Sequence, residues 1–217
     1  MPSQVLPLGG KPAFYFEHSR ADVIARLPQP LGRALDVGCG AGRVGEALRS
    51  AGATHLVGIE MDPDAAARAR ATFDAVYEGD AERILAQLAG DDTFDLICCY
   101  DILEHLYDPE SVLRKLHAVA APEGMLHISI PNARHLSLIR DLVWRGTFGY
   151  EVVGHRDATH LRWFTKSDIV ALVEECGWTV IEVATHRFRP WRAIVNRLTR
   201  GYASEFFAVQ WYVRCSA

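Results

Sequence analysis

The stretch that most constrains the fold is 33–43, which reads Arg-Ala-Leu-Asp-Val-Gly-Cys-Gly-Ala-Gly-Arg. Leu35 and Val37 predict a short buried strand, and the three glycines after it allow a tight turn and a close approach to another molecule. Asp36 would be buried in this strand, where a carboxylate needs a partner. A helix is expected next, and its N-terminal amides would face a ligand lying across the turn.

Short apolar segments typical of strands alternate regularly with segments of helical pattern up to residue 131. Further strands are expected at 55–60, 75–77, 94–100 and 125–130, with helices at 14–27, 44–52, 65–72, 82–88 and 109–120. Asp62-Pro63 and Asp108-Pro109 each predict a helix start, with Asp as N-cap and Pro at the first helical position. This alternation predicts an α/β fold with a doubly wound, mainly parallel sheet.

The alternation breaks after residue 131. Residues 132–164 are weakly periodic, which favours a functional cover over a bare loop. Thr165-x-x-Asp168 predicts a capping box for a helix that ends at Gly177. Strands are expected at 178–183 and 206–213. We therefore expect one domain over 1–217, with substrate-covering insertions at about 132–164 and 187–202.

Composition excludes several classes of protein. The 217 residues, 49% hydrophobic and 23% charged, fit one soluble globular domain. A net charge of −4 gives no general attraction for nucleic acid. The five cysteines have no zinc-site spacing, and their odd number argues against a disulfide framework. A reducing, cytoplasmic location is expected.

Two ligands compete for the glycine turn. Gly40-Ala-Gly-Arg-Val-Gly45 matches the G-x-G-x-x-G dinucleotide fingerprint, and Glu60 lies at the distance expected for a ribose-binding acid. This hypothesis predicts a nicotinamide-dependent oxidoreductase. The match starts two residues late, however, because the first glycine after the strand is Gly38.

The segment 35–42, Leu-Asp-Val-Gly-Cys-Gly-Ala-Gly, resembles motif I of the class I S-adenosylmethionine (SAM) dependent methyltransferases. The resemblance continues in order, through 57–60, 79–81, 94–105, 124–131 and, more loosely, 164–183. It implies a Rossmann-like sheet of seven strands in the order 3-2-1-4-5-7-6, with strand 7 antiparallel.

The resemblance also implies the residues that bind SAM. A sulfonium cation that also carries an ammonium group favours nearby carboxylates and backbone dipoles. Glu60 could accept both ribose hydroxyls, because a carboxylate has two acceptor oxygens. The segment Phe14-Tyr-Phe-Glu17 resembles methyltransferases in which a Tyr reaches the cofactor. The implied set is Tyr15, Asp36, Gly38, Cys39, Gly40, Glu60, Met61, Asp80, Ala81, Tyr100 and Asp101.

The stretch 100–106, Tyr-Asp-Ile-Leu-Glu-His-Leu, resembles small-molecule O-methyltransferases, including those of ubiquinone biosynthesis. The Asn/Asp-Pro-Pro-Tyr signature of amino-directed enzymes is absent, so we expect in-line transfer to oxygen. Candidate bases are His105, His155 and His160. His105 could instead cap a helix, and His160 could merely anchor the cover. A catalytically silent SAM-binding subunit is a further alternative.

A metal site is also conceivable. Asp101, Glu104 and His105 would share one face of a helical turn. They resemble the Glu-x-x-Glu-His group of small-RNA 2′-O-methyltransferases and some ubiquinone-pathway enzymes, with His155 or His160 completing the site. A divalent metal is possible but not favoured, because the sequence locates too few ligands.

The two insertions are expected to select the acceptor, a small molecule. Aromatic residues in 132–164 suit a planar or glycan-like acceptor, although Trp163 and Phe164 are expected in the core. In 187–202, Trp191, Ile194, Val195 and Leu198 follow helical spacing opposite several arginines. We favour an amphipathic cap over the site. An anionic substrate or a peripheral membrane contact through 187–202 are alternatives, an RNA acceptor is less favoured, and the oligomeric state stays open.

Overall fold

The computed structural model describes residues 20–25, 27–29, 31–88, 93–186 and 190–217. Its centre is a seven-stranded sheet in the order β3-β2-β1-β4-β5-β7-β6. The strands are β1 Arg33–Val37, β2 His55–Glu60, β3 Ala75–Glu78, β4 Phe94–Tyr100, β5 Ala120–Pro131, β6 Thr179–Ala184 and β7 Gln210–Ser216. Strands β1 to β5 pair in parallel, and β7 is antiparallel to both β5 and β6. The predicted fold is confirmed.

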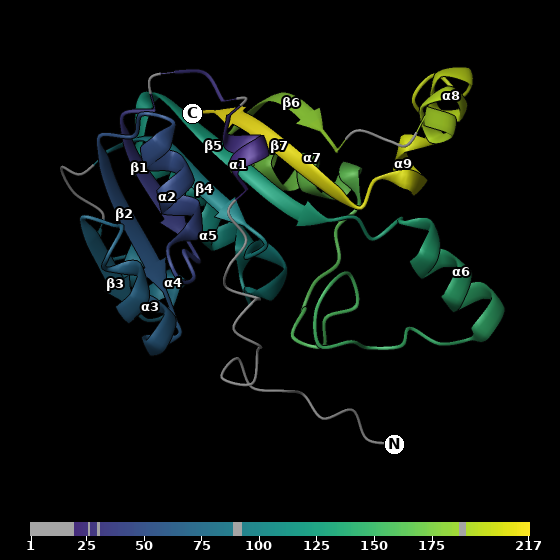
Figure 1. Ribbon diagram of the computed structural model, residues 1–217, viewed down its shortest axis with the longest axis horizontal. Helices are drawn as coiled ribbons and strands as arrows, with labels where there is room; N and C mark the ends of the chain where they lie inside the picture. Colours follow the sequence, from purple (N-terminus) through teal and green to yellow (C-terminus); the bar gives the residue numbers. More distant parts are fainter. Residues whose placement is uncertain (1–19, 26, 30, 89–92, 187–189) are drawn as a thin grey trace.

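The described helices are α1 Ala21–Ile24, α2 Arg43–Ser50, α3 Pro63–Ala69, α4 Ala81–Leu85, α5 Pro109–Ala118, α6 Leu136–Arg145, α7 Lys166–Glu175, α8 Pro190–Leu198 and α9 Ser204–Phe207. Helices α1 to α5 and α7 pack on the two faces of this sheet, whereas α6 and α8 lie beyond its end (Figure 1). Side chains alternate along β4, so Leu96 and Cys98 join the core under α1 to α3. Ile97 and Cys99 join the core under α4, α5 and α7.

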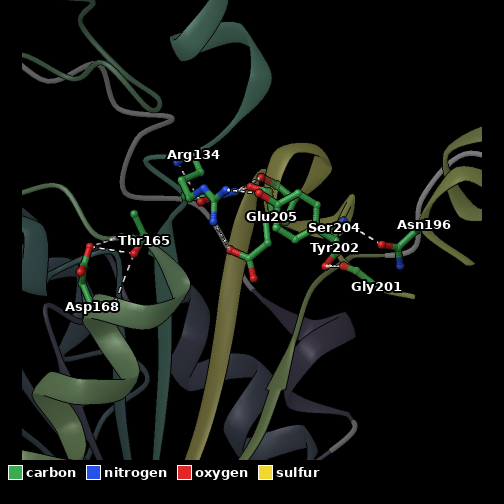
Figure 2. Close-up of polar contacts among 10 residues, drawn as sticks. Arg134, Thr165, Asp168, Asn196, Gly201, Tyr202, Ser204 and Glu205 are labelled. Carbon is green, nitrogen blue, oxygen red and sulfur yellow. Dashed lines mark hydrogen bonds and ion pairs between the residues drawn. The ribbon is translucent and has the colours of Figure 1, made fainter. Parts of the chain in front are cut away.

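The predicted helix starts are confirmed. The carboxylates of Asp62 and Asp108 each accept a hydrogen bond from the backbone N–H three residues later, at 2.8 and 2.9 Å. Thr165 and Asp168 form the capping box, in which each side chain bonds the backbone N–H of the other residue (Figure 2). These local bonds fix where the chain turns from loop into helix.

Several predicted boundaries differ from the structure, and three of these differences matter most for the site and the insertions. Within the described part of 14–27 the helix covers only Ala21–Ile24, and Tyr15 lies outside the described residues. Strand β5 begins at Ala120 rather than at 125, because a register shift opposite β4 accommodates its first residues. Strand β7 begins at Gln210 rather than at 206, because Phe206 and Phe207 belong to α9.

The two insertions are joined at their bases. An isolated bridge pairs Asn132 with Phe164, which closes the first insertion around α6. The buried Asn132 amide also donates to the carbonyls of Glu205 and Ala208, at 2.9 and 2.8 Å, just before β7. This side chain therefore holds both insertions at the same end of the sheet.

The burial predicted for the insertions is partly wrong. Phe164 is buried, but Trp163 is 38% exposed, because its ring packs against Phe148 and not into the core. On α8, Ile194 and Leu198 are 61% and 78% exposed. The apolar side of α8 is therefore not packed over the site as the cap hypothesis required.

Candidate active site

The carboxyl ends of β1, β2 and β4 lie side by side. Val37 at the end of β1 pairs with Ile59 of β2 on one side and with Cys99 of β4 on the other. The glycine turn, Glu60 and Asp101 therefore meet at one edge of the sheet, where parallel α/β proteins bind ligands.

The glycine turn is bonded to the end of β2. The Gly38 N–H donates to the carbonyl of Ile59 at 2.8 Å. Gly38 has a φ of 78°, which side chains rarely allow, and a Cβ there would lie 3.1 Å from the side chain of Ile102. Glycine at this position lets the turn pass close beneath the segment that follows β4.

The Glu60 side chain is hydrogen-bonded to this turn. One carboxylate oxygen accepts the Gly40 N–H and the other accepts the Asp62 N–H, both at 2.8 Å. Burial raises the pKa of Glu60 despite these bonds. Glu60 therefore lies at the ligand edge as predicted, with both oxygens already oriented by backbone amides.

Asp36 lies beneath the turn, buried in β1. Burial first, and the neighbouring Glu60 second, raise the pKa of Asp36 to about 8. Among the described residues, its Oδ2 has no hydrogen-bond partner. The adjacent Cys39 thiol is also buried, and burial raises its pKa too. Two buried acids side by side suit a cationic ligand, so these residues fit a sulfonium cofactor.

The remaining predicted cofactor residues occupy different environments. Met61 is half exposed directly after Glu60. Asp80 follows β3 and caps α4 by accepting the Arg83 N–H at 3.2 Å, so Ala81 is the first residue of that helix. The Tyr100 hydroxyl instead lies 2.8 Å from Nδ1 of the buried His127, inside the sheet.

Asp101 adopts a left-handed conformation, with a φ of 54°. Its carboxylate binds the Arg20 guanidinium, the Gln210 amide and, at 3.3 Å, the Ser129 hydroxyl. Strained non-glycine backbone of this kind occurs at functional sites when the surroundings hold it in place. Asp101 therefore does not continue a helical turn with Glu104 and His105, and its predicted place among these metal ligands was wrong.

Glu104, His105 and His160 come together instead. Possible ligand atoms of the three side chains all lie within 4.8 Å of one another. The imidazole rings of His105 and His160 meet edge to face, with centroids 4.8 Å apart. Burial raises the pKa of Glu104 to about 8, and neither of its oxygens has a hydrogen-bond partner among the described residues.

The segment around Thr159 anchors this group. The backbone N–H groups of Leu161 and Arg162 donate to the Glu104 carbonyl, at 2.8 and 3.1 Å. Nδ1 of His105 lies 3.1 Å from the Thr159 carbonyl and 3.2 Å from the Thr159 hydroxyl. Because that hydroxyl donates its proton to Asp157, Nδ1 is the donor in this group. A neutral His105 then carries its lone pair on Nε2, as a general base or a metal ligand requires. The anchoring role suggested for 159–162 is present, and it does not exclude chemistry at His160.

His155 is placed differently. It lines the same small cavity as Glu104 and His160. Its Nε2 lies 2.6 Å from the Val209 carbonyl, and its ring stacks on His135. Burial lowers the pKa of His155, which favours the neutral form. These contacts hold the first insertion against the start of β7.

Sequence reasoning missed Arg20 and Gln210. They bind Asp101 from positions 81 and 109 residues away. No local motif marks contacts over such separations, so only the folded topology could have revealed them.

The fold and the site together define an α/β domain whose glycine turn and buried acids fit a cationic nucleotide-like cofactor. A family model described as a methyltransferase domain matches residues 15–183. The chain belongs to this methyltransferase domain family, and its resemblance to the class I SAM-dependent enzymes is confirmed. The family match favours SAM over the dinucleotide.

Several proteins are similar over most of the chain. Ubiquinone biosynthesis O-methyltransferase of Xylella fastidiosa is 29% identical, covering 84% of this chain and 75% of its own. The Aeromonas salmonicida protein of the same name is 28% identical, covering 73% and 67%. A SAM-dependent methyltransferase from Archaeoglobus fulgidus has a TM-score of 0.67 at 19% identity, covering 94% and 96%. A SAM-dependent methyltransferase from Mesorhizobium loti has a TM-score of 0.65 at 18% identity, and the match covers 92% of this chain and 98% of that one.

Proposed function

We propose that this methyltransferase transfers a methyl group from SAM to a hydroxyl oxygen of a small molecule. Support comes from relatives named as ubiquinone biosynthesis O-methyltransferases. The sequence after β4 also lacks the Pro-Pro-Tyr signature of amino-directed enzymes. The observation that carries the proposal is His105, which lies in the turn directly after β4 and whose Nδ1 is bonded to Thr159.

In this proposal, different residues of the site bind the cofactor and transfer the proton. When bound, SAM supplies an electrophilic methyl group on a sulfonium. Asp36 and Glu60 hold the cationic cofactor at the ends of β1 and β2. Nε2 of His105 takes the proton of the acceptor hydroxyl, as the new oxygen–carbon bond forms and the sulfur–carbon bond breaks. Thr159 holds the imidazole ring in the required tautomer, and Asp157 orients Thr159 through bonds of 2.8 and 2.9 Å.

His105→Ala tests this assignment. We expect transfer from labelled SAM to a panel of phenols, hydroquinones and sugars to fall about 10²–10⁴-fold, the usual contribution of a general base. SAM affinity, measured by calorimetry, should stay unchanged. His55→Ala is the matched control, because this partly exposed His lies at the opposite end of the sheet.

Two results would contradict the proposal. Unreduced turnover of His105→Ala with normal SAM binding would remove the base assignment. SAM binding by the unaltered chain, without transfer to any hydroxyl of the panel, would favour the silent-subunit alternative.

The cluster of one carboxylate and two imidazoles after β4 supports a second candidate, a divalent metal site. Glu104, His105 and His160 offer one oxygen and two imidazole nitrogens within 4.8 Å, a ligand set that suits a divalent transition metal. An ion there would lower the pKa of Glu104 and keep it ionised. Elemental analysis after loading the protein with zinc tests this. We expect about one bound ion, lost in Glu104→Gln, and equal zinc content in both proteins would exclude the site.

A further inference from the structure

Helices α6 and α8 project beyond the β5–β7 end of the sheet (Figure 1). Several of their apolar side chains are exposed. On α8, Trp191, Ile194 and Leu198 are 55%, 61% and 78% exposed. Near the end of α6, Val143 and Trp144 are 66% and 82% exposed. Large exposed apolar groups clustered in this way mark an interaction surface.

The same two helices carry cations. Segment 187–204 contains five arginines and no acidic residue, in a chain whose net charge is −4. Arg197 of α8 and Arg200, two residues after that helix, are exposed. Arg140 and Arg145 of α6 are exposed as well, and both form ion pairs with the buried Asp141. Trp and Leu on one side with arginines beside them is the pattern of helices that lie in the interface of an anionic bilayer.

The surface is held in a fixed position. Arg134, just before α6, forms an ion pair with Glu205 at 3.2 Å, and its guanidinium packs over the rings of Tyr202 and Phe206 (Figure 2). The Asn196 side chain of α8 accepts the Ser204 N–H at 2.7 Å. The base of α6 and helix α8 are therefore both tied to α9.

The surface lies beside the active-site edge. Pro131 at the end of β5 pairs with Gln210 at the start of β7, and the Gln210 amide binds Asp101. Helix α6 follows the end of β5, and α8 is connected through α9 to the start of β7. A flat partner that binds to the exposed faces of α6 and α8 would therefore lie close to the active site.

We propose that the exposed faces of α6 and α8 dock this methyltransferase on an anionic lipid bilayer. Phosphate headgroups complement the arginines, while the apolar side chains enter the headgroup boundary. A second copy of the chain complements this surface less well, because two α8 helices in contact would bring their arginines together. None of the helices in the described part of the chain has the length and apolar character that crossing a bilayer requires, so the contact is peripheral.

Vesicle flotation of the full chain tests the proposal without methyl transfer, so its failure and that of the proposed activity are distinguishable. We expect binding to phosphatidylcholine vesicles that contain phosphatidylglycerol, weakened by salt. Ile194→Asp with Leu198→Asp should lower binding at least about tenfold, and Trp144→Asp should lower it as well, because each loses apolar contact and adds a repelled charge. Arg197→Gln should lower it about fivefold, on anionic vesicles only.

Ile181→Asp is the matched control, because Ile181 is 49% exposed on the edge strand β6, away from both helices. It should bind like the unaltered chain. Circular dichroism and SAM binding check that every variant folds. The proposal is overturned if the unaltered chain does not float with anionic vesicles, or if the double aspartate variant floats equally well. Self-association that the double variant abolishes, without any vesicle binding, would also overturn it in favour of a protein contact.

Discussion

Replacing Asp36 by Asn measures how the buried carboxylate beneath the glycine turn affects the free energy of unfolding. The pKa of Asp36 rises from its ordinary value of 3.8 to about 8, first through burial and then through Glu60. The folded protein therefore holds this proton more tightly than the unfolded chain does. Asp36 destabilises the fold progressively as the pH rises above about 4, and the loss levels off above about 8.

The magnitude follows from the pKa difference. One pKa unit corresponds to about 1.4 kcal/mol, so ionising Asp36 costs the SAM-free fold on the order of 5 kcal/mol. The free energy of unfolding should therefore fall by up to about 1.4 kcal/mol per pH unit between pH 5 and 8. Asp36→Asn carries no charge at any pH and should remove this part of the slope.

Urea unfolding of the SAM-free protein across this pH range measures the slope. Asp74→Asn is the control. The backbone N–H of Leu56 and the neighbouring Arg49 lower the pKa of Asp74, so its ionisation is complete below this range. The Asp74→Asn variant should therefore leave the slope of unfolding free energy against pH unchanged. Equal slopes for Asp36→Asn and the unaltered chain would refute this account of the buried acid.

The same argument predicts how SAM binding depends on pH. A cationic cofactor needs Asp36 ionised, so its affinity should rise by up to about tenfold per pH unit below pH 8 and then level off. Asp36→Asn should bind SAM weakly at every pH. An affinity that did not change between pH 6 and 8 would contradict a direct charge interaction between Asp36 and the cofactor.

Three further substitutions probe the frame around the site by urea unfolding. Asn132→Ala should cost about 2–4 kcal/mol, since two carbonyls at the base of the insertions lose their donor, and a cost below about 0.5 would contradict this. Trp178→Phe should cost about 1–3 kcal/mol, because the Leu113 carbonyl loses the indole N–H at 3.1 Å. Gly58→Ala should destabilise by about 1–3 kcal/mol, because its Cβ would lie 2.7 Å from the Cys39 sulfur, and Cys39→Ala should partly relieve this.

The sheet order and the cofactor edge were predictable because they depend on local patterns. Strand periodicity, Asp-Pro helix starts and the glycine turn each act within a few residues, and the motif resemblance supplied their order. The position of Glu60 was predictable for the same reason, since it ends a strand that must lie beside the turn.

Long-range contacts account for what was not predictable. Asp101 looked like the first residue of a helical turn, but Arg20 and Gln210 hold it in a left-handed conformation. His160, and not Asp101, lies beside Glu104 because segment 157–162 folds back onto the turn Leu103–His105 after β4. The α8 periodicity was correct, but periodicity alone does not say whether an apolar face is buried.

The position of β7 has a consequence for synthesis on the ribosome. Strand β6 is made before β7, yet β6 pairs only with β7 in the sheet, which itself needs β5. Until residues 210–216 leave the exit tunnel, β6 has no neighbour and β5 presents a bare edge to other nascent chains. We expect the first five strands to assemble first, and the sheet to close only once residues 210–216 have emerged, with β5 open to chaperones in the interval.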